Sequence, residues 1–430
     1  MTDLPAFQLS NDFQYALDQM EAGANLFITG RAGTGKSTLL RIFRKTTKKN
    51  CVVLAPTGVA ALNVQGQTIH SFFGFPPRLL QRKDVKPNRR YRRLFERLDI
   101  LIIDEISMVR ADVMDAINWG LQVNRGSSQP FGGVQVVFFG DLYQLPPVVS
   151  TEMERQYFSQ VYASPYFFSA DALDYIEAEM IELQQVYRQD SRLFLRLLEG
   201  IRNATIDRDD LEELNQRYIP NFDNTGQNYL TLAARNAKVN RINRQELDAL
   251  VNPTHTYLAE IKGNFPERLY PTDPAIQLKE GAQVMTLRND SEKRYVNGTI
   301  GTIVKCKSDA IIMRITEGEK ERVVEVGYDE WEIIRYNMDM DNPTKIGTET
   351  VGTFKQLPVR LAWAVTIHKA QGKTFDRVII DLGSGAFESG QTYVALSRCR
   401  TLEGIILAQP LQPRDVMVDP AIVEYYRSMR

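Results

Sequence analysis

The sequence predicts an α/β protein made of two doubly wound parallel-sheet domains, with a small β-rich insertion in the second. Over the first 180 residues, short apolar runs alternate with helical patterns, as expected for strands buried on both faces of a parallel sheet. This alternation stops near residue 255, where short β segments are separated by Gly, Asn, Asp and Lys turns. The α/β pattern resumes at residue 361, which indicates that the β segments interrupt the second domain.

The first domain is predicted to span residues 1–182. The apolar runs indicate strands at 26–29, 52–55, 100–103 and 136–139, and the helical patterns indicate helices at 36–46 and 111–123. A doubly wound sheet binds its ligand beyond the carboxyl ends of its strands, so polar residues at those ends are candidates for a site. A small basic insertion is expected at about 72–97, because the segment 78–97 carries nine basic residues and two acidic ones.

The second domain is predicted to span residues 183–430. Helices are expected at 193–202, 211–217 and 237–250, and strands at 229–233, 378–381 and 404–407. The insertion covers about 255–355, and its β segments predict a small antiparallel barrel. These segments are 283–287, 299–305, 310–315, 322–326 and 331–334.

The composition excludes several classes of protein. A chain that is 43% hydrophobic and 24% charged is globular, and its net charge of −1 means that any nucleic-acid site is a local basic groove. Cys51, Cys306 and Cys399 are too far apart to suggest a zinc site or a disulfide framework. The sequence has neither an apolar run of membrane-spanning length nor a targeting signal at its start. We therefore expect a cytoplasmic protein with no membrane partner.

Residues 25–38 contain the motif that carries most information about function. An apolar strand leads into Gly30-x-x-x-x-Gly35-Lys36-Ser37, which is the pattern of a phosphate-binding loop before a helix. Glycines let backbone N–H groups approach a phosphate, and the helix N-terminus adds positive charge. Lys36 is expected to reach the β- and γ-phosphates and Ser37 to hold Mg²⁺. The predicted nucleotide-binding residues here are Gly33, Thr34, Gly35, Lys36, Ser37 and Thr38. The alternative is a Gly-rich turn without a ligand.

Two further strand ends carry polar residues suited to hydrolysis. Asp104 and Glu105 follow the strand 100–103, where Asp104 is predicted to hold Mg²⁺ and Glu105 to act as the base for an attacking water. Gln144 follows the strand 136–139 and is predicted to orient that water or sense the γ-phosphate. The alternatives are a surface carboxylate pair and a turn glutamine before Pro146 and Pro147.

The order of these three motifs resembles that of superfamily 1 helicases. The resemblance implies two RecA-like domains with ATP and Mg²⁺ in the cleft between them. It also implies that Arg188 and Arg398, in the positions of the fourth and sixth motifs, contact the phosphates from the second domain. Each arginine taken alone is more typical of a surface or ion-pair residue. Gly372, in the fifth motif, is expected to lie at the nucleotide.

The same resemblance implies contacts with single-stranded DNA. Exposed Thr, His and Lys residues can bind phosphates, and an aromatic ring can stack on a base. The predicted DNA-binding residues are Pro56, Thr57, Gly58, His70, Phe72, Pro147, Arg235, Thr366, His368 and Lys369. For Phe72 and the adjacent Phe73, packing in the core is an equally good interpretation.

The segment 183–202 resembles the signature of the Pif (petite integration frequency) family, although Asp190 shifts the spacing by one residue. This resemblance implies a superfamily 1B motor that moves 5′ to 3′ on single-stranded DNA. It implies action on forks or structured DNA, including RNA–DNA hybrids and G-quadruplexes, by a monomer in the cytoplasm at the nucleoid. It also implies that the barrel is Src-homology-three-like. Phe13 occupies the position of the family's adenine-reading Gln, which leaves Gln8 or Gln14 as candidates.

Other functions stay open at this point. A RecD-like 5′-to-3′ helicase carries similar motifs but depends less on the segment 183–202. A DNA-dependent ATPase that translocates without unwinding needs the same motor residues. A nucleotide-gated switch or kinase is disfavoured by the combination of Gln144, Arg188 and Arg398.

Overall fold

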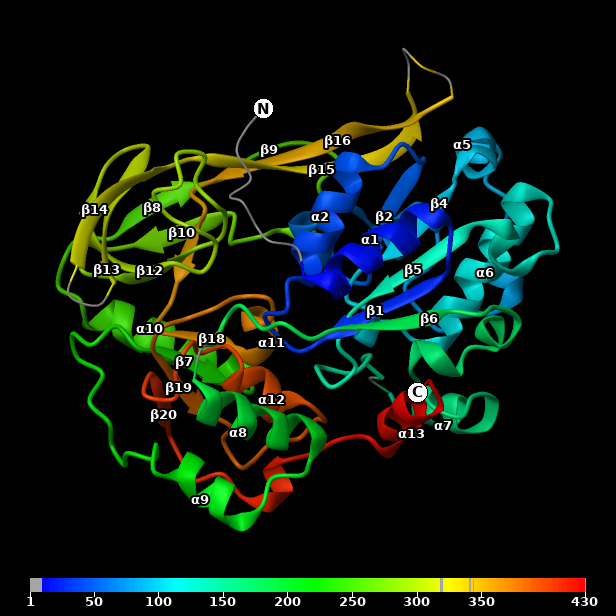
Figure 1. Cartoon of the computed structure of the whole chain (residues 1–430). Helices are drawn as coiled ribbons and strands as arrows, with labels where there is room; N and C mark the ends of the chain where they lie inside the picture. The colour runs from blue at the N-terminus through cyan, green and yellow to red at the C-terminus, as the bar shows by residue number, and fades with distance from the viewer. Residues whose placement is uncertain are drawn as a thin grey trace.

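The computed structural model describes residues 10–149, 151–189, 191–317, 320–339, 342 and 344–429. It confirms the predicted α/β class, with two parallel sheets and a separate β-rich part that interrupts the second sheet in sequence (Figure 1). In the part of the chain that the structure describes, no helix combines the length and apolar character needed to cross a membrane.

The first sheet has six strands in the order β3-β2-β4-β5-β1-β6, and all neighbouring pairs are parallel. In this order the strands are β3 (Gln67–Thr68), β2 (Cys51–Ala55), β4 (Ile100–Ile103), β5 (Gln135–Phe139), β1 (Leu26–Gly30) and β6 (Glu179–Leu183). The strands β1 and β5 are buried along their whole length, because helices cover both faces of the sheet. Because neighbouring strands are parallel, the carboxyl ends of β1, β4 and β5 lie at the same edge of the sheet.

Helices α1 (Asn11–Ala22) and α2 (Lys36–Thr46) pack on one face of this sheet through Phe13, Leu39 and Phe43. The other face is covered by α6 (Ala111–Arg125) and the short helices of the predicted basic insertion. The remaining helices of this part are α3 (Gly58–Asn63), α4 (Ile69–Phe73), α5 (Arg92–Arg97) and α7 (Glu152–Val161). The predicted helices 36–46 and 111–123 agree with α2 and α6 to within two residues.

The second sheet has four parallel strands, β18 (Ala364–Thr366), β7 (Leu230–Ala233), β19 (Val378–Asp381) and β20 (Ile405–Leu407), in that order. Its helices are α8 (Arg192–Asn203), α9 (Arg208–Asn215), α10 (Asn236–Ala249), α11 (Ile367–Ala370) and α12 (Gln391–Leu396). The helix α8 buries Phe194, Leu197, Leu198 and Ile201, the apolar positions expected to face inward. The predicted strand 378–381 matches β19 at both ends.

The insertion contains an antiparallel sheet in the order β14-β13-β12-β11-β17 and a short pair, β10-β8. These strands are β14 (Lys320–Gly327), β13 (Ala310–Glu317), β12 (Ile300–Cys306), β11 (Gln283–Thr286), β17 (Val359–Leu361), β10 (Ala275–Leu278) and β8 (His255–Leu258). Buried residues from both sheets form one core, as a small barrel requires, and we call this part the barrel.

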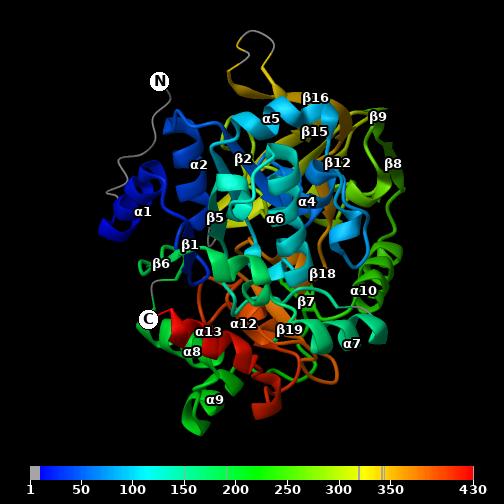
Figure 2. The ribbon, with the colours of Figure 1, turned by 90° about the vertical axis from the view of Figure 1, so that its right-hand side faces the viewer.

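The segment predicted as the last barrel strand, 331–334, belongs instead to a long hairpin. Strands β15 (Asp329–Met338) and β16 (Ile346–Gln356) pair with β9 (Glu260–Gly263) in a separate sheet. The hairpin extends from the barrel across to the first domain (Figure 1 and Figure 2). There the buried Tyr336 hydroxyl accepts a hydrogen bond from Val53 N at 3.1 Å, and its ring packs against Phe72. The hairpin extends as far as the first domain because its apolar residues are buried against the core of that domain.

The C-terminal helix α13 (Pro420–Ser428) lies within the range 183–430 that is predicted as the second domain. It packs on the core of the first domain through Ile422 and Tyr426. The Tyr426 hydroxyl lies 2.8 Å from the Thr29 hydroxyl at the end of β1, and its ring stacks on Tyr143. The helix is too short for its apolar face to indicate which of two cores it covers.

Candidate nucleotide site and DNA groove

A cavity of about 590 Å³ opens at the carboxyl edge of the first sheet and faces the second domain. It brings together the predicted phosphate loop, the acidic pair, Gln144, Gly372 and the two predicted arginines. Its lining residues are Ala32, Gly33, Thr34, Gly35, Lys36, Ser37, Thr38, Asp104, Glu105, Gly140, Gln144, Tyr187, Arg188, Gly372, Thr374, Arg398 and Arg400. A cavity of this size suits a nucleotide.

The phosphate loop joins β1 to α2 and needs its glycines. Gly35 has φ +88°, which glycine adopts without strain, and it precedes the first residue of α2. At Gly33 a Cβ would lie 2.6 Å from the Cβ of Arg188, so only glycine lets the segment after β6 pack here. Lys36 Nζ donates to the carbonyls of Gly30 at 2.6 Å and Arg31 at 3.0 Å, and burial lowers its pKa.

The acidic pair follows β4 directly, as predicted. Burial raises the pKa of both carboxyl groups, and the charge of Glu105 raises that of Asp104 further. The side-chain amide of Gln371, from the second domain, donates to Glu105 Oε2 at 3.1 Å and to Gln144 Oε1 at 3.2 Å. Sequence reasoning did not assign Gln371 a role, although it lies in the predicted fifth motif.

Gln144 is held by a buried network that crosses between the domains. Its Nε2 donates to Asp141 Oδ2 at 3.4 Å, and Asp141 Oδ1 accepts a hydrogen bond from Arg202 of α8 at 3.1 Å. The Arg202 guanidinium also lies over the Tyr143 ring, 4.3 Å from its centroid. Arg202 and Asp141 have exposed side-chain fractions of 5% and 0%, so this ion pair is inaccessible to water. The end of the signature segment therefore fixes the loop that carries Gln144.

Arg188 and Arg398 enter the cavity from the side of the second domain. Arg398 is buried and donates to the Val394 carbonyl at 2.9 Å and the Ser397 hydroxyl at 2.7 Å. Arg188 donates to the Ser397 carbonyl at 3.1 Å. Burial lowers the pKa of Arg188 to about 10 and that of Arg398 to about 9, and repulsion by Arg188 adds to the shift of Arg398. An anion in the cavity would reverse this unfavourable electrostatic arrangement.

The donor set at the cavity fits Mg²⁺. The Ser37 hydroxyl and the Asp104 carboxylate both line the cavity and are hard oxygen ligands. Among the described residues, no group of three or more His, Cys, Asp or Glu side chains could hold a metal ion. Two protein oxygens suit a cation whose remaining ligands come from phosphates and water.

None of the residues considered for reading adenine is placed in the nucleotide cavity by the described part of the chain. Gln8 lies outside the described residues. Phe13, at the position of the family's Gln, is 1% exposed and packs beneath the phosphate loop near Gly35. Gln14 donates to Asp18 on its own helix. Tyr187, which sequence reasoning did not single out, is 38% exposed and lines the nucleotide cavity.

A second large hollow, of about 1020 Å³, runs between α3, α10, the barrel and the segment before and after α11. We call it the groove. Of the predicted DNA-binding residues it includes Lys369. Thr57 and Thr366 cap the N-termini of α3 and α11 by accepting hydrogen bonds from Ala60 N and Lys369 N.

Three of the predicted DNA-binding residues, Phe72, Pro147 and Thr366, are buried. Phe72 is 7% exposed, and its ring contacts Phe73, Phe95 and Tyr336. It belongs to the core here, as the alternative interpretation had it, because α4 turns its apolar face inward. Pro147 is also buried. Burial lowers the pKa of the half-buried His70.

The remaining predicted contacts lie near the second sheet or beneath the barrel. His368 Nε2 lies 3.2 Å from Glu388 Oε2, and Arg235 lies over the exposed ring of Phe387. Gly58 begins α3 and is covered by Leu269, which leaves no room for a Cβ. In this arrangement the barrel side of the molecule therefore covers part of the predicted DNA surface.

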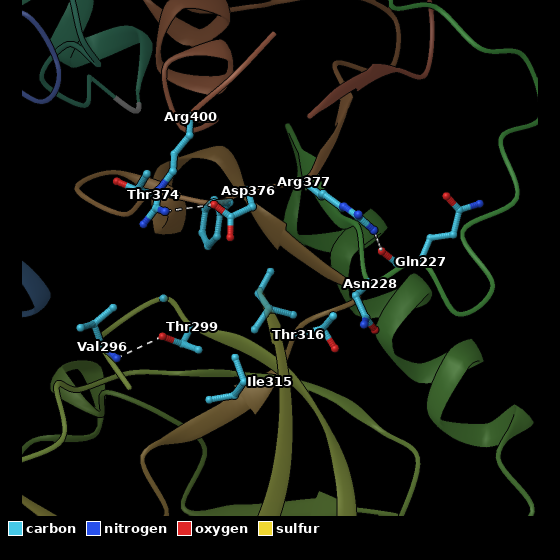
Figure 3. Close-up of a pocket in the computed structure, with 13 residues that line it drawn as sticks. Gln227, Asn228, Val296, Thr299, Ile315, Thr316, Thr374, Asp376, Arg377 and Arg400 are labelled. Atoms are coloured by element: carbon cyan, nitrogen blue, oxygen red, sulfur yellow. Dashed lines mark hydrogen bonds and ion pairs between the residues drawn. The ribbon is translucent and has the colours of Figure 1, made fainter. Parts of the chain in front are cut away.

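A smaller cavity of about 130 Å³ lies between the barrel and the second domain (Figure 3). It shares Thr374 and Arg400 with the nucleotide cavity. Arg400 pairs with Asp376 at 3.3 Å, and Arg377 donates to the Gln227 carbonyl at 3.2 Å (Figure 3). The barrel thus contacts the loop that also borders the nucleotide cavity.

Comparisons with known proteins agree with this site. The PIF1-like helicase family matches residues 8–210. The ATP-dependent DNA helicase Pif1 of Bdellovibrio bacteriovorus is 33% identical over 432 residues, which cover 98% of this chain and 92% of that protein. The chain belongs to the PIF1-like helicase family. It spans 61% of the Pif1 of Emericella nidulans, with 32% identity over 95% of this chain, and 65% of that of Xenopus laevis.

Structures of a Bacteroides Pif1 resemble this chain to different degrees. The complex with ADP-AlF4 is 36% identical, covers 99% of this chain and 97% of its own, and gives a TM-score of 0.90. The unliganded form gives 0.88 at the same identity and coverage. The form bound to ssDNA also has that identity and coverage but gives 0.70. The arrangement described here is therefore closer to the first two forms.

Proposed function

We propose that this chain is an ATP-dependent DNA helicase that moves 5′ to 3′ along single-stranded DNA. The observation that carries the proposal is the cavity in which Lys36, Asp104 and Glu105 of the first domain face Arg188 and Arg398 of the second. A nucleotide bound there would touch both domains, so its hydrolysis would change how the domains are held together.

The residues of the cavity support hydrolysis of the γ-phosphate. Water attacks the γ-phosphorus, the bond to the bridging β–γ oxygen breaks, ADP leaves, and Glu105 accepts the proton of the water. Lys36, Arg188 and Arg398 offset the negative charge on the phosphoryl oxygens. When bound, Mg²⁺ supplies further neutralisation of the β- and γ-phosphates, and Ser37 and Asp104 would hold it.

Residues 1–182 and 183–430 are the two proposed units of the motor, with the basic insertion in the first and the barrel in the second. Each unit contributes to the proposed DNA path. The first contributes Pro56, Thr57, Gly58 and His70, and the second Arg235, His368 and Lys369, whereas Phe72, Pro147 and Thr366 are buried in this arrangement. A path that touches both units lets each cycle of ATP hydrolysis shift one grip relative to the other.

DNA entry requires the barrel side of the molecule to move. Leu269 packs directly on Gly58, and Tyr336 anchors the long hairpin between β2 and α4. The lower TM-score against the ssDNA-bound Bacteroides Pif1 supports a rearrangement of this kind. The proposed partners are single-stranded and forked DNA, with RNA–DNA hybrids and G-quadruplexes as further substrates, acted on by a monomer in the cytoplasm.

The polarity of unwinding tests this function. We expect strand separation with Mg-ATP from a partial duplex with a 5′ single-stranded tail, and none from the same duplex with a 3′ tail. The reason is the resemblance of residues 183–202 to the Pif family, which implies a superfamily 1B motor. Gel separation of a labelled strand measures both reactions.

Three outcomes would contradict this function or its polarity. Unwinding from the 3′ tail would refute the polarity, and ATP turnover stimulated by single strands without any unwinding would favour a translocase. A chain with neither activity would refute the assignment as a motor.

The basic insertion is expected to contact duplex DNA ahead of the motor. Arg89, Arg90, Arg92 and Arg93 are exposed, and Arg92 is held by Glu96 at 2.8 Å. Changing all four to Gln should reduce the magnitude of the slope of log K against log salt, by about 0.9 for each lost phosphate contact. Fluorescence anisotropy with a forked substrate measures the slope.

Arg208→Gln serves as the control, because Arg208 is exposed on α9, far from α5 in both views (Figure 1 and Figure 2). An unchanged slope in the fourfold variant would show that the insertion makes no phosphate contacts.

A further inference from the structure

The side-chain amide of Gln371 takes up the hydrogen-bond acceptors that an attacking water would use. Its two N–H groups donate to Glu105 Oε2 at 3.1 Å and to Gln144 Oε1 at 3.2 Å. A water activated by Glu105 and oriented by Gln144 would donate its two O–H groups to the same oxygens. An amide nitrogen and a water cannot both occupy that position.

The surrounding contacts fix these acceptors in place. Glu105 as a carboxylate only accepts hydrogen bonds, so the amide must present its nitrogen to it. Gln144 uses its own Nε2 to donate to Asp141, which leaves its oxygen facing Gln371. Asp141 is in turn held by the buried Arg202. The pair of acceptors is therefore rigid, and Gln371 is the member that comes from the other domain.

Gln371 lies between two residues that line the groove. Lys369 precedes it and Lys373 follows it, and both line the groove together with Arg360 of β17. Gly372 adopts φ +78° with open space around it, so the loop has a flexible residue beside Gln371. The Lys373 carbonyl accepts a hydrogen bond from Arg398 at 3.4 Å, which ties the loop to the nucleotide cavity as well.

Three of the cations that line the groove, Arg360, Lys369 and Lys373, have only Asp273 as a nearby opposing charge among the described residues. Burial lowers the pKa of Lys373 to about 8, and Arg360 and Arg398 add to the shift. Burial also lowers the pKa of Lys369, Arg360 adds to this shift, and Asp273 offsets part of it. The Nε of Arg360 is buried with no hydrogen-bond partner among the described residues. A phosphate would supply both the missing charge and the missing acceptor.

We propose that Gln371 holds the place of the attacking water while no DNA is bound, and that a DNA phosphate bound by Arg360, Lys369 and Lys373 withdraws it. This inference rests on the proposed motor function and adds a means by which DNA stimulates ATP turnover. Gln371 is a positioning residue, because it acts through Glu105 and Gln144. Binding of a DNA phosphate is the event that starts the change, and its consequence is that the acceptors on Glu105 and Gln144 become free to bind the attacking water.

The test compares steady-state ATP turnover with and without a single-stranded oligonucleotide. Gln371→Met keeps the length of the side chain and removes both donors. We expect its kcat without DNA to rise on the order of tenfold, the bias that two ordinary hydrogen bonds impose, with a correspondingly smaller stimulation by DNA. KM for ATP should change little, since Gln371 does not line the nucleotide cavity. Gln216→Met, at the exposed glutamine that follows α9, is the matched control.

The phosphate site is tested separately with Lys373→Met. We expect the DNA concentration for half-maximal stimulation to rise severalfold, whereas Lys305→Met on the exposed side of the barrel should match the wild type. A fall in kcat of Gln371→Met both with and without DNA would overturn the inference, because Gln371 would then assist hydrolysis. The inference would also be overturned if DNA stimulates the wild type and Gln371→Met has the same kcat without DNA as the wild type. A wild type without DNA-stimulated turnover would instead refute the proposed function.

Discussion

Lys36→Ala should reduce ATP turnover by about 10²-fold or more, while single-stranded DNA still binds. Lys36 lies at the start of α2, and in this structure its ammonium group is held by the carbonyls of Gly30 and Arg31 inside the nucleotide cavity. A bound nucleotide would offer the ammonium group phosphate oxygens in place of those carbonyls. The positive charge of Lys36 would then stabilise the negative charge that develops on the phosphoryl oxygens during hydrolysis. Steady-state phosphate release measures the loss.

The matched control for this prediction is Lys45→Ala. Lys45 lies in the last turn of the same helix and is exposed, so its removal should leave turnover close to that of the wild type. Anisotropy of a labelled oligonucleotide checks that both variants bind DNA. Turnover at the wild-type rate in Lys36→Ala would refute the phosphate-loop assignment.

The sequence was sufficient to predict which residues meet at the edge of the first sheet. Lys36, Asp104 and Gln144 each follow a strand end, and parallel strands direct their carboxyl ends to one edge. The order of the strands in the sheet was not needed for this prediction. The resemblance to a helicase family added Arg188 and Arg398, which local pattern alone could not distinguish from surface arginines.

Contacts between distant parts of the chain could not be predicted in this way. The hydrogen bonds of Gln371 with Glu105 and Gln144 join residues more than 200 positions apart, and they depend on how the two domains face each other. The ion pair of Arg202 with Asp141, 61 positions apart, also depends on how the two domains face each other. Periodicity reports which side of an element is apolar, but it does not report which neighbour covers that side.

Short elements were the other source of error. Phe72 lies in a helix of five residues, too short to show a period of 3.6, so burial and exposure were equally plausible from sequence. The helix α13 and the long hairpin of β15 and β16 pack on the first domain although they come from the second half of the chain, and here the distance along the chain hides the contact. In each case the deciding interaction is tertiary packing of an aromatic residue.

Arg398→Ala should lower kcat for ATP by about 10²-fold or more, on the scale of an arginine finger. The guanidinium lies in the nucleotide cavity opposite the phosphate loop, and burial together with Arg188 lowers its pKa. Its hydrogen bonds run to neutral acceptors, the Val394 carbonyl, the Ser397 hydroxyl and the Lys373 carbonyl. The positive charge of Arg398 therefore has no anionic partner among these acceptors and can bind a phosphate. It stabilises the negative charge that develops on the phosphoryl group between the domains.

Because Arg398 is 1% exposed, its truncation could also unfold the second domain, and the experiment must separate the two effects. Arg398→Met retains most of the buried volume without the charge, and we expect it to lose turnover as severely as Arg398→Ala while its thermal midpoint stays nearer the wild type. Arg377→Ala, which removes an exposed arginine of the same domain, should hydrolyse ATP normally. A loss of less than about threefold in Arg398→Met would mean that Arg398 supports the fold and not the reaction, since arginine fingers act on a far larger scale.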